Sequence, residues 1–345
     1  DSEALPVYRR GAEISRGQKA TFYRNIIYTS LKSGELSDMH AYFRELLIKG
    51  ELAAAKLYFR YLLSGHEMEL LASLSQVFRE KFLSDIRIKN YLAIYYWLAL
   101  EYEQCSELVQ APLPEAADKA NESVAYIFLN YLKVLLSQPH GTQAAGDTRL
   151  YVLGESHSLG LNNSLLGWQG HSCLAQTRFV MGAKMFHLSS PENNLMKLLL
   201  ARQIASIPRG SHLLFTIGEI DCRPDEGIWQ THRQKQLPLD SLIENTVTGY
   251  IRWLVASLAD REPKTVGIQG IPAPKMEIAR QVGKEHLAQY ANMISQVNDK
   301  LKAEAAKNGF FFFDVYRLTA DSQGVSNDKY HVDNYHLSLQ VYQPE

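Results

Sequence analysis

The sequence lacks three features that would place it in a familiar class: paired cysteines, long apolar runs and an excess of charge of one sign. Its three cysteines, Cys105, Cys173 and Cys222, are odd in number, and their spacing fits neither a disulfide framework nor a zinc site. No apolar stretch approaches the roughly 20 residues that span a bilayer, and no signal peptide opens the chain. We therefore expect reduced thiols, a cytoplasmic protein and no membrane span.

Charge is balanced, because 36 Lys and Arg residues face 37 Asp and Glu residues. No net field draws such a chain to nucleic acid or to an anionic membrane, so we expect a neutral or mixed partner and no nucleic acid. What the chain does have is length and apolar content, with 345 residues of which 46% are hydrophobic. This is enough for two cores, so we expect two domains.

Residues 1–136 are predicted to form an all-α domain of helical hairpins. In "ELSDMHAYFRELLIKG", Leu36, Met39, Phe43 and Leu47 recur at the spacing of an amphipathic helix, and Gly50 ends it. A second helical stretch follows at once, which indicates an antiparallel pair. Small residues among aromatics loosely resemble tetratricopeptide repeats, although no clean period of about 34 residues is visible, and a bundle without repeats is the alternative. Such a domain can bind a protein partner.

Residues 137–148 are rich in small and turn-forming residues and are predicted to link this domain to a second one at 149–345. There, short apolar runs alternate with helical stretches, which is typical of an α/β fold with a parallel sheet. The expected strands are "RLYVL", "RFVMGAKMFHL", "HLLFTIG", "KTVGIQG" and "GFFFFDV", with the four phenylalanines at 310–313 in a buried strand. Sites in such sheets lie at the carboxyl ends of the strands.

Polar residues and a glycine stand where these runs end. Ser156 follows the first run in "YVLGESHSLG", Gly182 lies in the second, and "GEIDCR" after the third contains Glu219, Asp221 and Arg223. Because Gly182 has no Cβ, a backbone amide there can approach a ligand closely. A serine in a strand-to-helix turn is usually a helix N-cap, so Ser156 gains meaning only from the residues around it.

Two overlapping Asp-x-x-His arrangements follow the last run, Asp328 with His331 and Asp333 with His336. An Asp can orient an imidazole and stabilise its charged form while the other ring nitrogen takes a proton from a serine. Serine alone is a poor nucleophile, and such a base corrects this. Either pair is therefore a candidate to activate Ser156.

In their order along the chain, these blocks resemble the SGNH, or GDSL-type, hydrolase superfamily. They are Gly154-Glu155-Ser156 after the first strand, Gly182 after the second, a Gly-x-x-Asp block at 218–221, and a late Asp-x-x-His. The resemblance covers the whole second domain and none of the first. It implies a flavodoxin-like three-layer α/β/α sandwich and ester hydrolysis that needs no cofactor and no metal.

Carried over residue by residue, the resemblance makes Ser156 the nucleophile, His336 the general base and Asp333 the residue that orients it. The backbone amides of Ser156 and Gly182 would form the oxyanion hole. "DNYHLS" around His336 matches the superfamily's His-Leu-Ser ending better than "DKYHVD" does. The pair at 328 and 331 is therefore kept as the alternative base pair.

One block departs from the superfamily pattern, because Ile220 stands where an asparagine usually donates to the oxyanion. Losing one such donor typically costs about 3 kcal/mol of transition-state stabilisation. Arg223 is the candidate replacement, and a salt bridge to Asp221 or Glu219 is the alternative for its guanidinium. We expect all three of these charged residues to face the substrate, and His157 to lie at the rim of the site.

Three functions follow. The first is a serine esterase that removes a small acyl group, with acetyl preferred, from a carbohydrate or similar polar molecule through acyl-Ser156. The second is an O-acyltransferase that uses the same residues. The third is a degenerate SGNH domain that binds a ligand or partner without chemistry, with the helical domain as its interaction surface. We favour an active enzyme, because a binding domain has little need for the serine, the aspartate and the histidine together.

Overall fold

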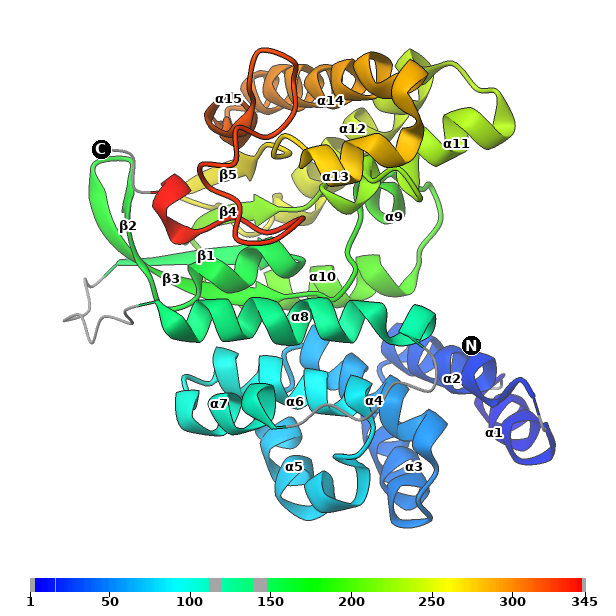
Figure 1. Ribbon diagram of the computed structural model, residues 1–345. Helices are drawn as coiled ribbons and strands as arrows, with labels where there is room; N and C mark the ends of the chain where they lie inside the picture. The colour runs from blue at the N-terminus through cyan, green and yellow to red at the C-terminus, as the bar shows by residue number, and fades with distance from the viewer. Residues whose placement is uncertain (1–3, 16, 112–118, 139–147, 343–345) are drawn as a thin grey trace. The chain divides into compact units, whose positions relative to one another are not determined.

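The computed structural model describes residues 4–15, 17–111, 119–138 and 148–342. The chain divides into two compact units, Asp1–Gln138 and Pro139–Glu345. In the described part of the first unit all regular elements are helices, and the second unit contains the sheet (Figure 1). Most of the predicted linker, residues 139–147, lies outside the described residues. Among the helices that the structure describes, none is long and apolar enough to cross a bilayer.

The first unit has eight helices in the part of it that is described. They are α1 (Ala4–Ile14), α2 (Lys19–Ser33), α3 (Leu36–Ile48), α4 (Leu52–Ser64), α5 (Met68–Phe82), α6 (Ile86–Leu98), α7 (Tyr102–Gln110) and α8 (Lys119–Ser137). The predicted helix before Gly50 is α3, and it buries Met39, Phe43 and Leu47 as the apolar stripe requires. Gly50 adopts a left-handed φ of 78° after the helix, a conformation that favours glycine.

A regular period is present in these helices although the residues do not show it. Helices α2, α4 and α6 begin at Lys19, Leu52 and Ile86, so successive hairpins start 33 or 34 residues apart. α2 contacts α4, α4 contacts α6, and α6 contacts α8, while α3, α5 and α7 each contact the helix before and the helix after them. This is the stacking of a helical-repeat array, in which each hairpin buries its apolar face on its neighbours. The period equals that of the tetratricopeptide unit, of about 34 residues, to within one residue.

The second unit is built around a six-stranded sheet. Its strands are β1 (Thr148–Gly154), β2 (Leu165–Trp168), β3 (His171–Phe179), β4 (His212–Thr216), β5 (Thr265–Gln269) and β6 (Phe311–Phe313), in the spatial order β2-β3-β1-β4-β5-β6. All neighbouring pairs are parallel except β2 with β3. Leu150, Val152 and Leu153 of β1 are fully buried, as expected for a central strand covered on both faces.

The parallel strands follow the order β3-β1-β4-β5-β6, which is that of a flavodoxin-like sheet. The chain moves from β1 to β3 on one side and then returns to β4 on the other. The reversal creates a topological switch point between β1 and β4, outside whose carboxyl ends ligands bind in such sheets. The α/β class predicted from the sequence is confirmed, with the antiparallel strand β2 as an addition.

Helices and short helical segments cover the sheet. They are η1 (Ser156–Leu161), α9 (Met185–Ser189), α10 (Leu195–Ser206), η2 (Ile220–Cys222), α11 (Gly227–Lys235), α12 (Leu239–Leu258), α13 (Met276–Ala279), η3 (Arg280–Val282), η4 (Lys284–His286), α14 (Leu287–Lys307), α15 (Val315–Thr319) and η5 (Leu339–Tyr342). α14 contacts β5 and β6, and α12 packs against α9, α10 and α14. Near the end of the chain, Leu339 and Tyr342 of η5 pack on a cluster that includes Leu150 and Val152.

Two strand predictions need correction. The strand predicted over 178–188 lies earlier, because β3 ends at Phe179 and the apolar residues after Gly182 form the short helix α9. Three of the four phenylalanines, Phe311–Phe313, form β6, but this strand is an edge strand, and Phe311 is 41% exposed. An edge strand has a neighbour on one side only, so its side chains are half-buried.

Candidate active site

Ser156 lies at the switch point, where β1 ends and the η1 turn begins. The preceding Gly154 is packed so tightly against β4 that a Cβ there would lie 2.0 Å from Thr216 Oγ1. The turn is fixed to β3, because the Thr177 hydroxyl donates to the carbonyl of Ser158 at 2.7 Å. The side chain that follows β1 is therefore held in a defined place, and Ser156 is only 4% exposed.

Gly182 reaches the same edge of the sheet. The last residues of β1 and β3 are paired, Gly154 with Phe179, and the amide of Val180 donates to the carbonyl of Gly154 at 2.8 Å. Gly182 follows with φ of 72°, in the left-handed region. The placement at this edge is compatible with the predicted oxyanion role of its amide, which stays a prediction.

The C-terminal segment after α15 presents Asp333 and His336 as a hydrogen-bonded pair. His336 Nδ1 donates to Asp333 Oδ2 at 2.6 Å, and the other carboxylate oxygen accepts from the amides of Tyr335 and His336 at 2.7 Å each. Burial alone would raise the pKa of Asp333, but the His336 hydrogen bond lowers it well below its ordinary value. An ionised carboxylate thus fixes both the ring and the turn that carries it. His336 is 1% exposed.

The alternative pair has a different geometry. Asp328 Oδ1 lies 3.1 Å from Lys275 Nζ. The backbone amide of Asp328 donates to the Ser326 hydroxyl at 3.0 Å. His331 Nδ1 bonds that same hydroxyl at 2.8 Å, so Ser326 lies between the two members of the predicted pair. Burial, together with the positive charges of His157 and Lys275, lowers the pKa of His331 to about 4. This histidine is neutral at pH 7, and its ring is oriented by a serine.

Sequence reasoning missed the residues that contact Ser156 most closely. The Ser156 hydroxyl donates to Glu155 Oε2 at 2.5 Å, and the other oxygen of Glu155 lies 2.7 Å from His157 Nδ1. His157 was expected at the rim of the site, but it is 3% exposed, and its Nε2 lies 3.0 Å from the carbonyl oxygen of Tyr335. The Glu-Ser-His order at 155–157 could have predicted the contact between Glu155 and His157, because a tight turn brings the first and third side chains together.

The predicted substrate-facing residues separate into two groups. Arg223 forms a two-pronged pair with Glu219, with nitrogen–oxygen distances of 2.6 to 3.0 Å, and lies 4.3 Å above the ring of Tyr335. The salt-bridge alternative for Arg223 is therefore the observed one, with Glu219 as its partner. Both side chains are partly exposed, at 18% and 12%, so both remain available to a substrate.

Asp221 cannot face a substrate in this arrangement, and that prediction is corrected. It is fully buried, and its carboxylate accepts from the amides of Met185 and Phe186 at 2.7 and 2.9 Å. It thereby caps the first turn of α9 and ties the loop after β4 to the loop after β3. Burial raises the pKa of Asp221 to about 7, although the two amide hydrogen bonds oppose the increase. Ile220 beside it is also buried.

One cluster of side chains has the composition of a metal site. Ligand atoms of Glu155, His157 and Glu219 all lie within 4.8 Å of one another, although the sequence offered no ligand cluster. The donor set does not fit a cation, because Arg223 occupies Glu219 and both nitrogens of His157 face oxygen atoms. The cluster is an ion-pair network in which protein cations already balance the two carboxylates.

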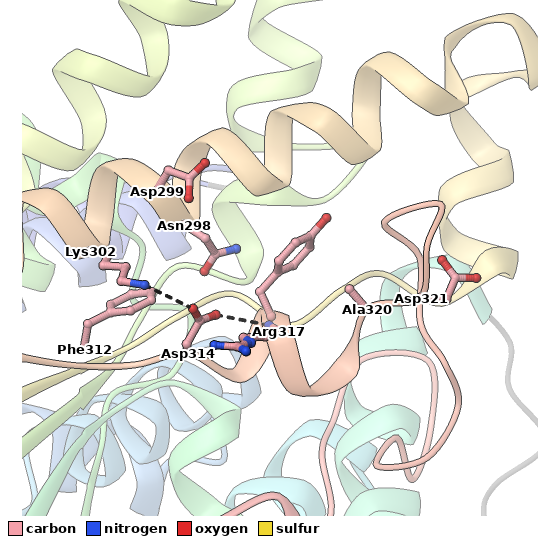
Figure 2. A pocket seen from close by; sticks show the side chains of 9 residues that line it. Asn298, Asp299, Lys302, Phe312, Asp314, Arg317, Ala320 and Asp321 are labelled. Carbon is pink, nitrogen blue, oxygen red and sulfur yellow. Dashed lines mark hydrogen bonds and ion pairs between the residues drawn. The ribbon is translucent and has the colours of Figure 1, made fainter.

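Two of this unit's cavities lie at different places in the fold. One, of about 20 Å³, is lined by Glu219, Tyr335 and His331 among others, so it borders the site. The other, of about 280 Å³, lies between α14, β6 and α15 (Figure 2). There, Asp314 accepts from the amide of Arg317 at 3.1 Å and lies 3.8 Å from Lys302 Nζ. Its lining includes no serine or histidine, so the smaller cavity is the one near the candidate chemistry.

Comparison with known proteins gives structural neighbours only. No protein-family model and no curated protein matches the chain. A structure described as a candidate acylhydrolase from Bacteroides fragilis is 15% identical, covers 62% of this chain and 88% of its own, and has a TM-score of 0.36. One described as a candidate platelet activating factor from Streptococcus pneumonia is 17% identical, covers 66% and 95%, and has a TM-score of 0.39.

A third structure, described as a GDSL-like lipase from Bacteroides thetaiotaomicron, is 12% identical, covers 62% of this chain and 90% of its own, and has a TM-score of 0.37. At such identities and scores the three structures assign no activity to this chain, so the function is argued from the site itself.

Proposed function

We propose that this protein is an SGNH-type serine ester hydrolase that removes a small acyl group, with acetyl preferred, from a carbohydrate or similar polar substrate. One observation carries the proposal. A serine at the switch point of a flavodoxin-like sheet lies on a turn whose next residue, His157, bonds the main chain of the segment that holds the Asp333–His336 pair. That set of groups is what acyl transfer from an ester to water requires.

In the reaction, the Ser156 oxygen attacks the ester carbonyl carbon while its proton passes to His336. With its Nδ1 proton held by Asp333, a neutral His336 carries its lone pair on Nε2, which is the state of a general base. The tetrahedral intermediate loses its alcohol, which takes the proton from His336, and acyl-Ser156 remains. Water then attacks the acyl carbon and gives a proton to His336. The second tetrahedral intermediate breaks its bond to Ser156, whose oxygen takes that proton back as the free acid leaves. Before attack, the serine hydroxyl must turn from Glu155 toward His336.

The polar substrate is supported by Glu219 and Arg223. Both side chains are partly exposed and offer charged hydrogen-bonding groups to a polar alcohol portion. This feature favours a polar ester over a lipid.

The decisive experiment treats the full chain with a fluorophosphonate probe and with a panel of acetylated sugars. We expect a covalent adduct on Ser156, located by mass spectrometry, together with acetate release that falls at least about a thousandfold in Ser156→Ala. Ser164→Ala, in the same connection between β1 and β2, is the matched control and should retain both signals. A folded wild-type protein that gives neither adduct nor acetate would reject the esterase and leave a binding module.

O-acyl transfer is the second candidate, and one observation favours it. Ser156 and His336 are only 4% and 1% exposed, so water has limited access to an acyl-enzyme formed there. The ratio of acetylated acceptor to free acetate distinguishes the two reactions. With an acetyl donor and a sugar acceptor present, a transferase yields more acetylated acceptor than free acetate. An esterase yields acetate at a rate that the acceptor does not change.

A further inference from the structure

The ring of His157 is surrounded by groups that only accept hydrogen bonds. Its Nδ1 lies 2.7 Å from a carboxylate oxygen of Glu155, and its Nε2 lies 3.0 Å from the carbonyl oxygen of Tyr335. A neutral imidazole has one N–H donor, whereas two acceptors on its two nitrogens require two. The geometry therefore indicates an imidazolium whose side chain is 2% exposed and paired with an equally buried Glu155.

This cation connects two segments that are distant in sequence. On one side, Glu155 bonds both His157 and the Ser156 hydroxyl. On the other side, Tyr335 lies between Asp333 and His336, and its amide donates to the same Asp333 oxygen as the amide of His336. A continuous series of hydrogen bonds of 2.5 to 3.0 Å thus runs from the serine to the turn that carries the base.

The base segment needs such an attachment because it has little regular structure. Between α15 and η5, the chain forms no described helix or strand, only isolated bridges such as the one that pairs His331 with Leu337. No strand pairing fixes the position of His336. The distance from its ring to Ser156 therefore depends on hydrogen bonds between the two segments. A displacement of about 1 Å at such a site can cost a hundredfold in rate.

We propose that His157 is a positioning residue whose imidazolium holds the Asp333–His336 turn against the Ser156 turn, while it keeps Glu155 ionised so that this carboxylate orients the serine hydroxyl. The proposal rests on the proposed function, because it assigns Ser156 and His336 their roles as nucleophile and base. His157 itself does not touch the substrate.

The charges around the ring agree with this role. Burial by itself lowers the pKa of His157, but the charge and hydrogen bond of Glu155 outweigh it and raise the pKa to about 9. In the loop after β4, the charge of Glu219 raises the pKa of His157 and the charge of Arg223 lowers it. His331 and His336 face the ring from the C-terminal segment. Burial raises the pKa of Glu155, and His157 and the Ser156 hydroxyl more than reverse this, to about 2.

A carboxylate with so low a pKa is a weak base. It accepts the hydrogen bond of the Ser156 hydroxyl, but it does not remove the proton at neutral pH. Glu155 and His157 therefore set where the hydroxyl lies in the resting site, and proton removal falls to His336.

The first test needs no substrate. Nitrogen-15 NMR of the histidine rings, assigned with His157→Gln, should show His157 protonated on both nitrogens from about pH 5.5 to about 8, while His331 is neutral over that range. A neutral His157 tautomer at pH 7 would overturn the proposal. Hydrogen exchange supplies a second measurement that is independent of activity: the amides of 333–338 should exchange faster in His157→Gln, and unchanged exchange there would also overturn it.

The second test measures the consequence for chemistry. In His157→Gln, kcat and the rate of fluorophosphonate labelling at Ser156 should fall about 10- to 100-fold, with KM changed less than about threefold. The matched control is His171→Gln, an exposed histidine on β3, which should leave both rates within about twofold. Glu155→Gln combined with His157→Gln should be no worse than the more damaging single change, because the two act as one unit.

The outcomes separate the two proposals. If the wild type labels and turns over, and folded His157→Gln does so at an unchanged rate, the positioning role is wrong and the esterase stands. If the wild type neither labels nor turns over, the esterase fails, and the ring NMR and amide exchange still decide whether His157 holds the segment.

Discussion

At the scale of single residues, the two Asp-x-x-His arrangements differ in what their carboxylates bind. The Asp333 carboxylate bonds its histidine directly at 2.6 Å, whereas the Asp328 carboxylate pairs with Lys275 Nζ at 3.1 Å. An aspartate that holds the Nδ1 proton determines which tautomer the base adopts. Only Asp333 makes this hydrogen bond to its histidine. Substitution of each aspartate in turn therefore tests whether His336 or His331 is the general base.

We expect Asp333→Asn to lower kcat by about 10²- to 10⁴-fold, because an asparagine can stabilise the wrong tautomer and cannot balance the charged ring. Asp328→Asn, the matched control, should change kcat less than about threefold. Steady-state rates on an acetyl ester measure both. The reverse ranking would move the base to His331 and its pair.

Stability at different pH values should report the charge of His157. Its pKa is raised from 6.5 to about 9 in the folded protein, so its contribution to the free energy of unfolding is complete below about pH 6.5 and is lost as the pH rises through 9. At one pKa unit per about 1.4 kcal/mol, the contribution is on the order of 3 kcal/mol. Urea unfolding of wild type and His157→Gln should therefore differ most at pH 6 and least near pH 10, and a constant difference would contradict an imidazolium.

Local patterns were enough to predict part of this site, and long-range contacts account for the rest. Asp333 and His336 are three residues apart, so their contact is encoded in one turn. The capping of α9 by Asp221 joins residues 35 or more positions apart, and the bond from His157 to Tyr335 spans 178 positions. No local spacing predicts such contacts, which is why Asp221 was expected at the substrate and His157 at the rim.

At the scale of elements, the end of β1 is tightly constrained by its neighbour β4. A Cβ at Gly154 would lie 2.0 Å from the Thr216 hydroxyl and 2.6 Å from its carbonyl oxygen, and the backbone atom cannot move without shifting β4. We expect Gly154→Ala to lower the free energy of unfolding by about 3 kcal/mol or more, and to slow labelling of the adjacent serine.

The control for that change is Gly167→Ala in β2, where an added Cβ meets no atom within 4 Å. Chemical unfolding should place this variant within about 0.5 kcal/mol of wild type. Equal effects of the two substitutions would show that close approach of β1 and β4 is not what requires glycine at 154.

Strand and helix positions were predictable where periodicity was strong, and less so where short segments share apolar residues. β1, β4 and β5 coincide with the runs read from the sequence. The second run was misplaced because its buried apolar residues belong to two different segments. Val180 and Met181 are buried in the loop after β3, whereas Met185 is buried in α9. The antiparallel hairpin of β2 and β3 carries polar residues such as Gln169 and His171 at its turn, so its apolar pattern is weak.

At the scale of the whole molecule, the chain contains two kinds of core. The helical unit repeats a hairpin every 33 or 34 residues without a matching sequence repeat, because each hairpin buries different side chains on its neighbours. Phe43 and Tyr58, for example, stack with ring centroids 4.7 Å apart between α3 and α4. In the sheet unit the core is formed across strands, as with Val152 and Leu214. Cores of such different origin need not unfold together.

Separate cores predict separate consequences of core damage. Phe59 in α4 and Phe215 in β4 are both fully buried, and truncation of such a residue to alanine typically costs about 3–5 kcal/mol. We expect Phe59→Ala to lower the calorimetric transition of the helical unit and to leave Ser156 labelling within about twofold at 25 °C. Phe215→Ala should lower the other transition and reduce labelling. If both substitutions instead shift one common transition equally, the two units unfold as a single cooperative body, and the helical repeats are then part of what stabilises the site.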